Sequence, residues 1–322
     1  MHLLLIHQNF PAQFRELAPA WLAAGHRITA VGCQEHPPEG EAWHGLRFIH
    51  YAFEDEPTAL QRGQAVARIC KLVLQQSPPP DLALVHSGWG EALQLRSALG
   101  STPLVIYPEL WGTPAALGLG VDTNLNAQLL SSSRALEHWL ERQNLLADLA
   151  LQQADAAVIP SRSQLESFPP ELRGRLRLIA EGVNLERLHP DPSSSLELEG
   201  LDRLRPGDAL VTFVSRKLEP LRGLRAALQA WPAVAACHPE AQLILVGAEH
   251  GLGYGQEPPQ GSSHLSAALE ALPPDVERER IHIAGHLAYL DLIRLLQCSA
   301  CHLALSYPYT LSWSWLEAMA CA

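Results

Sequence analysis

The chain has 322 residues, of which 47% are hydrophobic and 18% are charged, and its formal net charge is -11. This length predicts about two domains, and the composition supplies enough apolar side chains for folded cores. The acidic total, without a basic face, argues against nucleic acid as a partner. The six cysteines are scattered and the apolar run at the N-terminus is short. We therefore expect a reduced, cytoplasmic protein without a signal peptide or a transmembrane segment.

Short apolar runs alternate with helical patterns along the first half of the chain. The runs that predict strands cover residues 2–7, 27–33, 81–87, 103–110, 155–161 and 176–182. Because these runs are apolar on both faces, they fit strands that are buried in a parallel sheet. Helical patterns lie between them, one opening at Pro11 and closing at Gly25, and another over residues 58–76. Proline at the start and glycine at the end are typical helix boundaries.

The alternation pauses over residues 186–208, which are polar and contain three prolines and a serine run, as a linker does. It then resumes, with strands expected at 209–217, 241–248, 281–286 and 301–307 and helices at 224–237 and 290–297. We predict an α/β fold of two doubly wound, Rossmann-like domains that face a cleft. The expected boundaries are 1–188 for the N-terminal domain, 189–207 for the linker and 208–322 for the C-terminal domain.

Open parallel sheets bind ligands beyond the carboxyl ends of their strands, so the residues that follow each strand are the first candidates for a site. His7 follows the first strand, and His86, Gly88 and Glu91 follow the run at 81–87. Glycine lets backbone N–H groups approach an anion or a sugar, and His86 can shuttle a proton or bond a hydroxyl. A capping turn with a hydrogen-bonded histidine is the alternative.

Arg216 and Arg222 bracket the loop between the first strand and the first helix of the second domain. Two guanidiniums beside a helix N-terminus suit a diphosphate, because arginine offers paired donors and the helix end adds partial positive charge. The alternative is that both arginines are surface charges. Glu317 lies early in the last expected helix, where it either complements the helix dipole or accepts bonds from vicinal hydroxyls such as those of a ribose.

Several motifs are missing from the sequence. It contains no D-x-D, no G-x-S-x-G and no phosphate-binding P-loop, and the single C-x-x-C at Cys298 and Cys301 has no second pair. Histidines with metal-ligand spacing on a helix are also absent. We therefore expect neither a metal nor a cofactor.

The motifs HQNFP, VHSGWGEAL, FVSRKLEPLRG and LSWSWLEAMA together resemble the retaining glycosyltransferases of family 4, which have the GT-B fold. The first motif resembles a bacterial subgroup. The resemblance implies that a hexosyltransferase-like enzyme of carbohydrate biosynthesis transfers a sugar from a nucleotide diphosphate donor, with retention and without a metal. It implies that the acceptor side is the N-terminal domain and that the nucleotide-sugar side is the C-terminal domain.

The same resemblance assigns roles to individual residues. Arg216 and Arg222 fall on the basic pair that holds the diphosphate, although the family usually has lysine at the second position. Glu317 falls on the glutamate that binds the ribose. The remaining donor contacts fall on His286 and Leu287 at the nucleobase, and on Leu311, Ser312 and Trp313 at the sugar. Tyr309 stands where the family usually has a second glutamate, eight residues before Glu317, and a tyrosine hydroxyl can bond a sugar but cannot act as a carboxylate.

Other readings stay open at this point. Family members continue past the LEAMA helix, so the second domain is expected to be incomplete. The alternative function is a truncated or vestigial nucleotide-sugar-binding protein without turnover. A sugar-nucleotide epimerase or a phosphorylase on the same architecture is a further alternative. The donor base, the donor sugar and the acceptor (glycan, lipid or small molecule) are not predicted, and peripheral contact with a membrane stays open.

Overall fold

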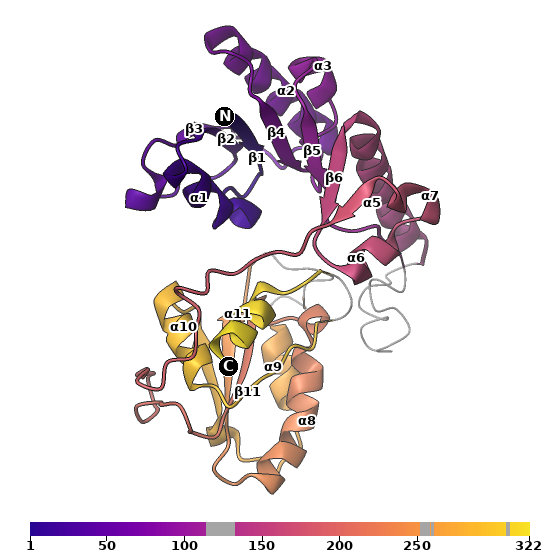
Figure 1. Ribbon diagram of the computed structural model, residues 1–322. Coiled ribbons are helices and arrows are strands. Elements are labelled where there is room, and N and C mark those ends of the chain that lie inside the picture. The colour runs from indigo at the N-terminus through magenta and orange to yellow at the C-terminus, as the bar shows by residue number, and fades with distance from the viewer. Residues whose placement is uncertain (114–132, 252–257, 259–260, 307–309) are drawn as a thin grey trace. The chain divides into compact units, whose positions relative to one another are not determined.

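A computed structural model describes residues 1–113, 133–251, 258, 261–306 and 310–322, and it divides the chain into two compact units (Figure 1). Unit 1 is built from Met1–Thr113 and Arg134–Glu181, and unit 2 is built chiefly from Gly182–Ala322. Each unit contains its own parallel sheet with helices on both faces, which confirms the predicted α/β class.

In the described residues, the sheet of unit 1 has seven parallel strands in the order β3-β2-β1-β4-β5-β6-β7. The strands are β1 (His2–Ile6), β2 (Arg27–Gly32), β3 (Arg47–His50), β4 (Leu82–His86), β5 (Leu104–Tyr107), β6 (Ala156–Ile159) and β7 (Leu176–Leu178). The order reverses between β1 and β4, which pair in parallel. Ligand crevices in open sheets form at such a switch point.

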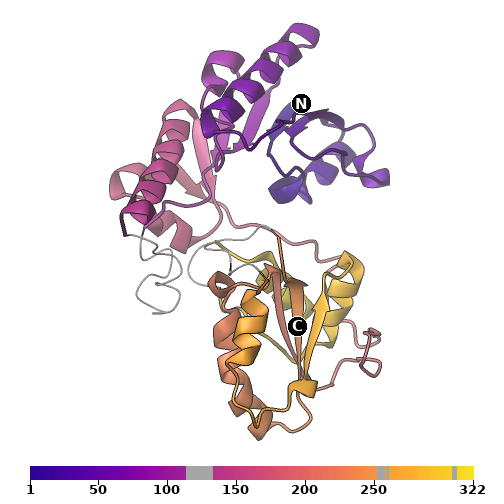
Figure 2. The ribbon, with the colours of Figure 1, turned by 180° about the vertical axis from the view of Figure 1, so that it is seen from behind.

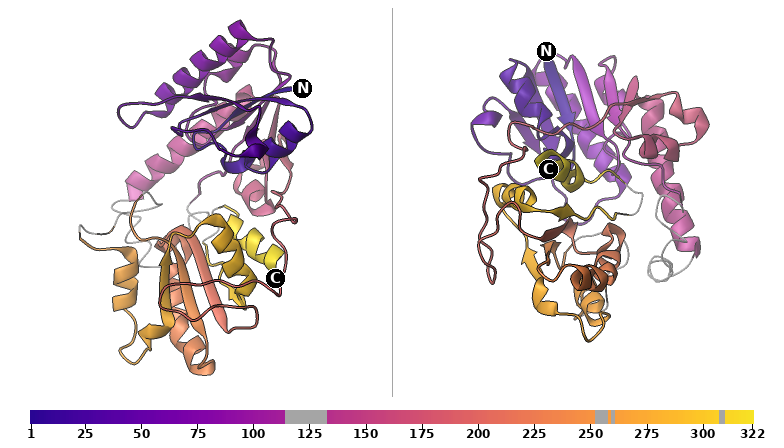
Figure 3. Two further views of the ribbon diagram at one scale, coloured as in Figure 1. Left: turned by 90° about the vertical axis from the view of Figure 1, so that its left-hand side faces the viewer. Right: turned by 60° about the horizontal axis from the view of Figure 1, so that its bottom comes forward.

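Helices cover both faces of this sheet. They are α1 (Leu17–Ala23), α2 (Ala59–Gln76), α3 (Leu95–Leu99), α5 (Ser133–Gln153), α6 (Arg162–Ser167) and α7 (Pro170–Arg173). Along β1, Leu3 and Leu5 join a core cluster with residues of α1, whereas Leu4 and Ile6 join another with residues of α2, α3 and α5. An edge-on view shows α1 and α2 on opposite sides of the sheet (Figure 3). The strands are therefore apolar on both faces, as predicted.

The sheet of unit 2 has the order β10-β9-β8-β11 in the described residues, and its pairs are parallel. Its strands are β8 (Leu210–Lys217), β9 (Gln242–Ala248), β10 (Ile281–Gly285) and β11 (Cys301–His302). The order reverses between β8 and β11. One face packs on α8 (Leu224–Cys237) and α9 (His264–Glu270), and the other on α10 (Tyr289–Cys298), with α11 (Trp313–Cys321) packed against α10 (Figures 1 and 2).

The sequence prediction gave no bounds for α3, α5, α6, α7 and α9, and three further elements differ from it. Strand β3 was missed, because it is a short edge strand whose side chains are exposed or half-buried and lack an apolar run. The strand expected over 301–307 is regular only at Cys301–His302. The helix expected to open at Pro11 begins at Leu17, because residues 12–14 first form a 3-10 turn that buries Phe14.

The segment predicted as a linker has no helix or strand, but it belongs to unit 2 and is anchored in its core. A single antiparallel bridge joins Leu196 and Leu204, and both side chains are buried in the core beside α10. Leu188 is buried against α10 and α11. The segment is polar overall, so its composition gives no sign that these three leucines are buried.

Gly223 begins α8 with a left-handed φ of 86°. A Cβ at this position would lie 2.4 Å from the backbone oxygen of Leu305, in the loop after β11. We therefore expect Gly223→Ala to lower the free energy of unfolding of unit 2 by about 2 kcal/mol or more, measured by urea denaturation. The control in the same unit is Gly182→Ala, since a Cβ at Gly182 would meet open space and its φ lies outside the left-handed range. Equal losses in the two variants would contradict the steric argument.

Candidate functional site

Two buried histidines meet at the switch point of unit 1. His7 directly follows β1 and His86 ends β4, and these strands are neighbours. Their ring centroids lie 4.6 Å apart, and the Trp89 ring lies 5.4 Å from His7 and 4.7 Å from His86. The two positions that the sequence analysis selected separately therefore belong to one aromatic cluster.

The hydrogen bonds of the pair indicate its tautomers. The Asn9 backbone N–H donates to His7 Nδ1 at 2.9 Å, and the Gly88 backbone N–H donates to His86 Nδ1 at 3.3 Å. A neutral imidazole whose Nδ1 accepts carries its proton on Nε2. Both Nε2 atoms are buried and have no hydrogen-bond partner within the described residues. Glu109 Oε2 lies 3.7 Å from His86 Nε2. The pair thus presents two N–H donors.

Burial keeps both histidines neutral. It lowers the pKa of His7 to about 4, against a smaller opposing effect of the Gln13 side chain. Burial also lowers the pKa of His86 well below its ordinary value, and the neighbouring His7 adds to this effect. A histidine with so low a pKa is a weak base at pH 7. A proton shuttle is therefore disfavoured for His86. Its full burial and the bond from the Gly88 N–H agree with the alternative of a hydrogen-bonded histidine in a capping turn, and the role of a hydroxyl partner stays a prediction.

Acid should weaken unit 1 through His7. Its folded pKa of about 4 lies below the unfolded value of 6.5, so between these values only the unfolded chain takes up the proton. The contribution of this pKa difference to the free energy of unfolding is complete above pH 6.5 and is lost as the pH falls toward 4. We expect the stability of the natural chain to fall faster than that of His7→Gln, by up to about 1.4 kcal/mol per pH unit. Urea unfolding at pH 7, 6 and 5 measures both slopes, and identical slopes would contradict the depressed pKa.

Glu91 lies in the interior of unit 1 rather than at an open strand end. Its side chain is fully buried, the Tyr51 hydroxyl donates to Oε1 at 3.4 Å, and Arg62 Nε lies 3.8 Å from the same oxygen. Arg62 also donates to the sulfur of Cys33. Burial raises the pKa of Glu91 to about 7. These contacts join the loop after β4 to α2, so we do not place Glu91 among the ligands of a substrate.

In unit 2, the two predicted arginines stand on either side of the turn that enters α8. Arg216 is exposed near the end of β8, and Arg222 ends the 3-10 turn that leads into Gly223. Arg222 Nε lies 3.9 Å from Oε1 of the buried Glu219. Lys217 is buried, and its Nζ donates to the Gly251 carbonyl at 2.7 Å. The end of β8 and the turn that follows it therefore carry three cationic side chains, Arg216, Lys217 and Arg222.

The loop after β11 reaches the same place. Leu305 touches Gly223 at the start of α8, and the Ser314 hydroxyl donates to the Val214 carbonyl of β8 at 3.3 Å. This bond places the first turn of α11 against the carboxyl end of β8. The predicted sugar-side residues Leu311, Ser312 and Trp313 lead into that turn and are half-buried. Tyr309 lies outside the described residues.

The predicted nucleotide-side residues lie around α10 and α11. His286 is exposed and Leu287 is half-buried between β10 and α10. Glu317 is 3% exposed, and its Oε1 accepts a hydrogen bond from the Tyr289 hydroxyl at 3.0 Å. The carboxylate expected at the ribose is thus held by the first residue of α10.

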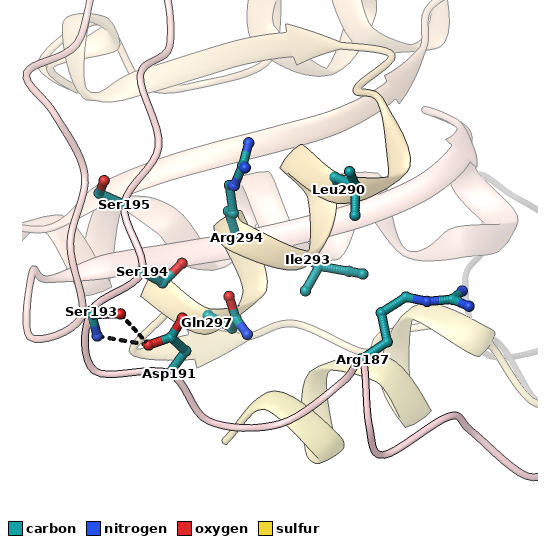
Figure 4. Close-up of a pocket in the computed structure, with 9 residues that line it drawn as sticks. All are labelled: Arg187, Asp191, Ser193, Ser194, Ser195, Leu290, Ile293, Arg294 and Gln297. Atoms are coloured by element: carbon teal, nitrogen blue, oxygen red, sulfur yellow. Dashed lines mark hydrogen bonds between the residues drawn. The ribbon is translucent and has the colours of Figure 1, made fainter.

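A cavity of about 480 Å³ lies elsewhere in unit 2, between α10 and the irregular segment before β8 (Figure 4). Its lining consists of Arg187, Asp191, Ser193, Ser194, Ser195, Leu290, Ile293, Arg294 and Gln297. Asp191 accepts from the backbone N–H and the hydroxyl of Ser193. None of the predicted site residues lines this cavity.

The residues that the structure describes contain no group of three or more His, Cys, Asp or Glu side chains that could hold a metal ion. In the same part of the chain, no helix is both long and apolar enough to cross a membrane.

The sequence pattern of the glycosyl transferase family 4 group matches residues 25–188, which are 164 of the 322 residues. The chain belongs to this family. The resemblance that the motifs carry is therefore confirmed at the level of the family, while the HQNFP subgroup stays a prediction. The family is one of glycosyltransferases, so the coarse prediction of a glycosyltransferase is confirmed with it. No curated protein is similar enough in sequence to count as a relative.

Solved glycosyltransferase structures share the fold of this family member. Anabaena HepE, solved in complex with UDP and glucose, superposes with a TM-score of 0.58 at 16% identity, over 100% of this chain and 78% of that one. WaaG, a glycosyltransferase of lipopolysaccharide biosynthesis, superposes with a TM-score of 0.63 at 14% sequence identity, over 100% of this chain and 79% of WaaG. The catalytic domain of starch synthase IV from Arabidopsis thaliana, bound to ADP and acarbose, superposes with a TM-score of 0.60 at 12% sequence identity. The match covers 99% of this chain and 80% of that domain. These likenesses show the GT-B fold.

Sequence reasoning missed two residues at these sites. Glu109 was counted within a strand, but β5 ends at Tyr107 and Pro108 follows it. That proline was a usable signal, because proline cannot donate to a sheet. Tyr289 had no such signal, since an aromatic residue at the start of an amphipathic helix normally belongs to the core.

Proposed function

We propose that this family 4 member is a retaining glycosyltransferase that moves a sugar from a nucleotide diphosphate donor to an acceptor without a metal. The observation that carries the proposal is the switch point of unit 2. There Arg216 and Arg222 flank the turn that enters α8, and Ser314 in the first turn of α11 donates to β8. Glu317 follows in the second turn of α11. Paired arginine donors and the N–H groups at a helix start suit a diphosphate.

The same groups account for catalysis of sugar transfer. Cleavage of the bond between the sugar and the phosphate develops negative charge on the diphosphate. The two guanidinium groups and the positive end of α8 would stabilise that charge without a metal ion. In this proposal Glu317 accepts bonds from the ribose, the backbone at His286 and Leu287 frames the base, and residues 311–313 contact the sugar.

Unit 1 supplies hydrogen-bond donors in this proposal. The Nε2–H groups of His7 and His86 would bond hydroxyl oxygens of the acceptor, beside the backbone of Gly88. The C-terminal domain, residues 208–322, would hold the donor, and the N-terminal domain, residues 1–188, the acceptor. The HepE complex contains UDP and glucose, which supports a donor of the same chemical class. A cytoplasmic location and a bacterial origin stay predictions.

A turnover assay tests the proposal. The chain is incubated in EDTA with UDP-, ADP-, GDP- and TDP-linked hexoses and a mixture of simple sugar acceptors. We expect release of one nucleoside diphosphate, together with a product that keeps the anomeric configuration of the donor, as read by proton NMR. Inversion, or turnover that depends on Mg²⁺, would contradict the mechanism. Tight binding without turnover would favour the non-catalytic nucleotide-sugar-binding alternative.

A further inference from the structure

The contact between Tyr289 and Glu317 joins two predicted subsites of unit 2. Tyr289 is the first residue of α10, three positions after His286, and Glu317 lies in the second turn of α11. The Tyr289 hydroxyl donates to Glu317 Oε1 at 3.0 Å. Because the acceptor is a carboxylate, this is a hydrogen bond of the stronger, charge-assisted kind.

Tyr289 is itself held in place by its surroundings. Its ring packs against the small buried cluster at α10 and α11, which includes Ile293, Leu296 and Cys321. The guanidinium of Arg187 lies over the ring, 5.8 Å from its centroid. An aromatic ring that is packed on one side and covered by a cation has little freedom to rotate. The hydroxyl is therefore a fixed donor toward Glu317.

We propose that Tyr289 is a positioning residue for the nucleotide. Its hydroxyl fixes the carboxylate of Glu317 in the orientation that accepts the ribose hydroxyls, and the first turn of α10 ties that orientation to the backbone at His286 and Leu287. This inference rests on the proposed function, in which Glu317 binds the ribose. It adds a residue that touches no substrate atom and acts through Glu317.

The chemistry of the carboxylate allows both bonds. An ionised carboxylate has two oxygens with about four acceptor positions, and the Tyr289 hydroxyl occupies one of them on Oε1. The Tyr289 hydroxyl holds Oε1 before the ligand binds, so less order has to be imposed on the carboxylate during binding. Removal of the hydroxyl should therefore weaken the contact with the ribose hydroxyls and spare the contacts with the base and the diphosphate.

The test compares ribonucleotides with dideoxyribonucleotides. UDP, ADP and GDP, and their 2′,3′-dideoxy counterparts, are titrated calorimetrically into the natural chain, Tyr289→Phe and Glu317→Gln. The matched control is Tyr51→Phe, which removes a hydroxyl that donates to the buried Glu91 in unit 1. Phenylalanine keeps the ring that packs under Arg187, and thermal unfolding checks that each variant is folded.

We expect the natural chain and Tyr51→Phe to prefer the ribose form of the bound nucleotide by about tenfold or more. In Tyr289→Phe and Glu317→Gln this preference should fall to about threefold or less, through weaker binding of the ribose form. Affinity for the dideoxy form should change by less than about twofold, because that form makes no bond to the carboxylate.

Each other outcome overturns a distinct claim. If Tyr289→Phe keeps the full preference for the ribose form and Glu317→Gln loses it, the inference is overturned and the proposed function stands. Equal weakening of both nucleotide forms in Tyr289→Phe would show a merely structural role and also overturn it. Full preference in Glu317→Gln would overturn the ribose assignment and the inference together. Failure of the natural chain to bind any of these diphosphates would overturn the proposed function itself.

Discussion

Arg216→Ala is expected to weaken the binding of a nucleoside diphosphate by about a hundredfold or more, which corresponds to about 2.7 kcal/mol. Arg216 is exposed at the end of β8, where the chain turns into α8. A guanidinium can make two charge-assisted hydrogen bonds to phosphate oxygens, each stronger than a neutral one. Calorimetric titration of the natural chain and the variant measures the loss.

Matched variants separate this contact from general electrostatics. Arg294→Ala removes the same charge from unit 2, at an arginine that pairs with Asp291 on α10, and we expect less than about a threefold change. Arg216→Lys should lie between the two, because lysine keeps the charge and loses the paired donors. Equal losses in Arg216→Ala and Arg294→Ala would contradict a specific diphosphate contact.

Arg62→Met should destabilise unit 1 by about 3 kcal/mol or more at pH 8. The Arg62 guanidinium is the cation next to the fully buried Glu91, and its side chain is itself only 11% exposed. Methionine fills a similar volume but leaves the carboxylate without a counter-charge, which is more costly than removal of both charges. Urea unfolding followed by tryptophan fluorescence measures the change.

Two comparisons test the cause of this loss. Arg62→Met combined with Glu91→Gln should recover most of the stability, since no buried charge remains. The loss in Arg62→Met should also shrink at pH 5. The folded pKa of Glu91 is already raised to about 7, above the unfolded value of 4.5, so its effect on stability is most favourable below 4.5 and declines as the pH rises through 7. An equal loss at both pH values would contradict a buried, raised-pKa glutamate.

Buried strands were the part of the fold that the sequence predicted best. The strands β1, β2 and β8 lie deep in parallel sheets, so both of their faces are apolar and their runs are easy to recognise. The edge strand β3 has no such run. The packed segment before β8 also escaped prediction, because burial of a few isolated leucines leaves the polar composition unchanged.

Part of the candidate site could also be predicted, because it lies at the ends of strands that the sequence indicates. The rule that ligands bind at strand ends selected His7, His86 and Arg216, and all three lie at switch points of their sheets. The rule does not say which way a side chain turns after the strand. The Glu91 side chain points into the interior and lies beside Arg62, and Glu317 accepts a hydrogen bond from Tyr289 of another helix. Such contacts join residues that are far apart in the chain, so spacing alone cannot indicate them.

The claim that unit 2 binds a diphosphate is tested most directly by titration of UDP, ADP and GDP beside UMP, AMP and GMP. We predict that at least one diphosphate binds about tenfold or more tightly than its monophosphate, because the second phosphate adds charge-assisted bonds to arginine. We also predict that Arg216→Ala abolishes this difference. Equal affinity for the diphosphate and the monophosphate, or no binding of any diphosphate at millimolar concentration, would contradict the account.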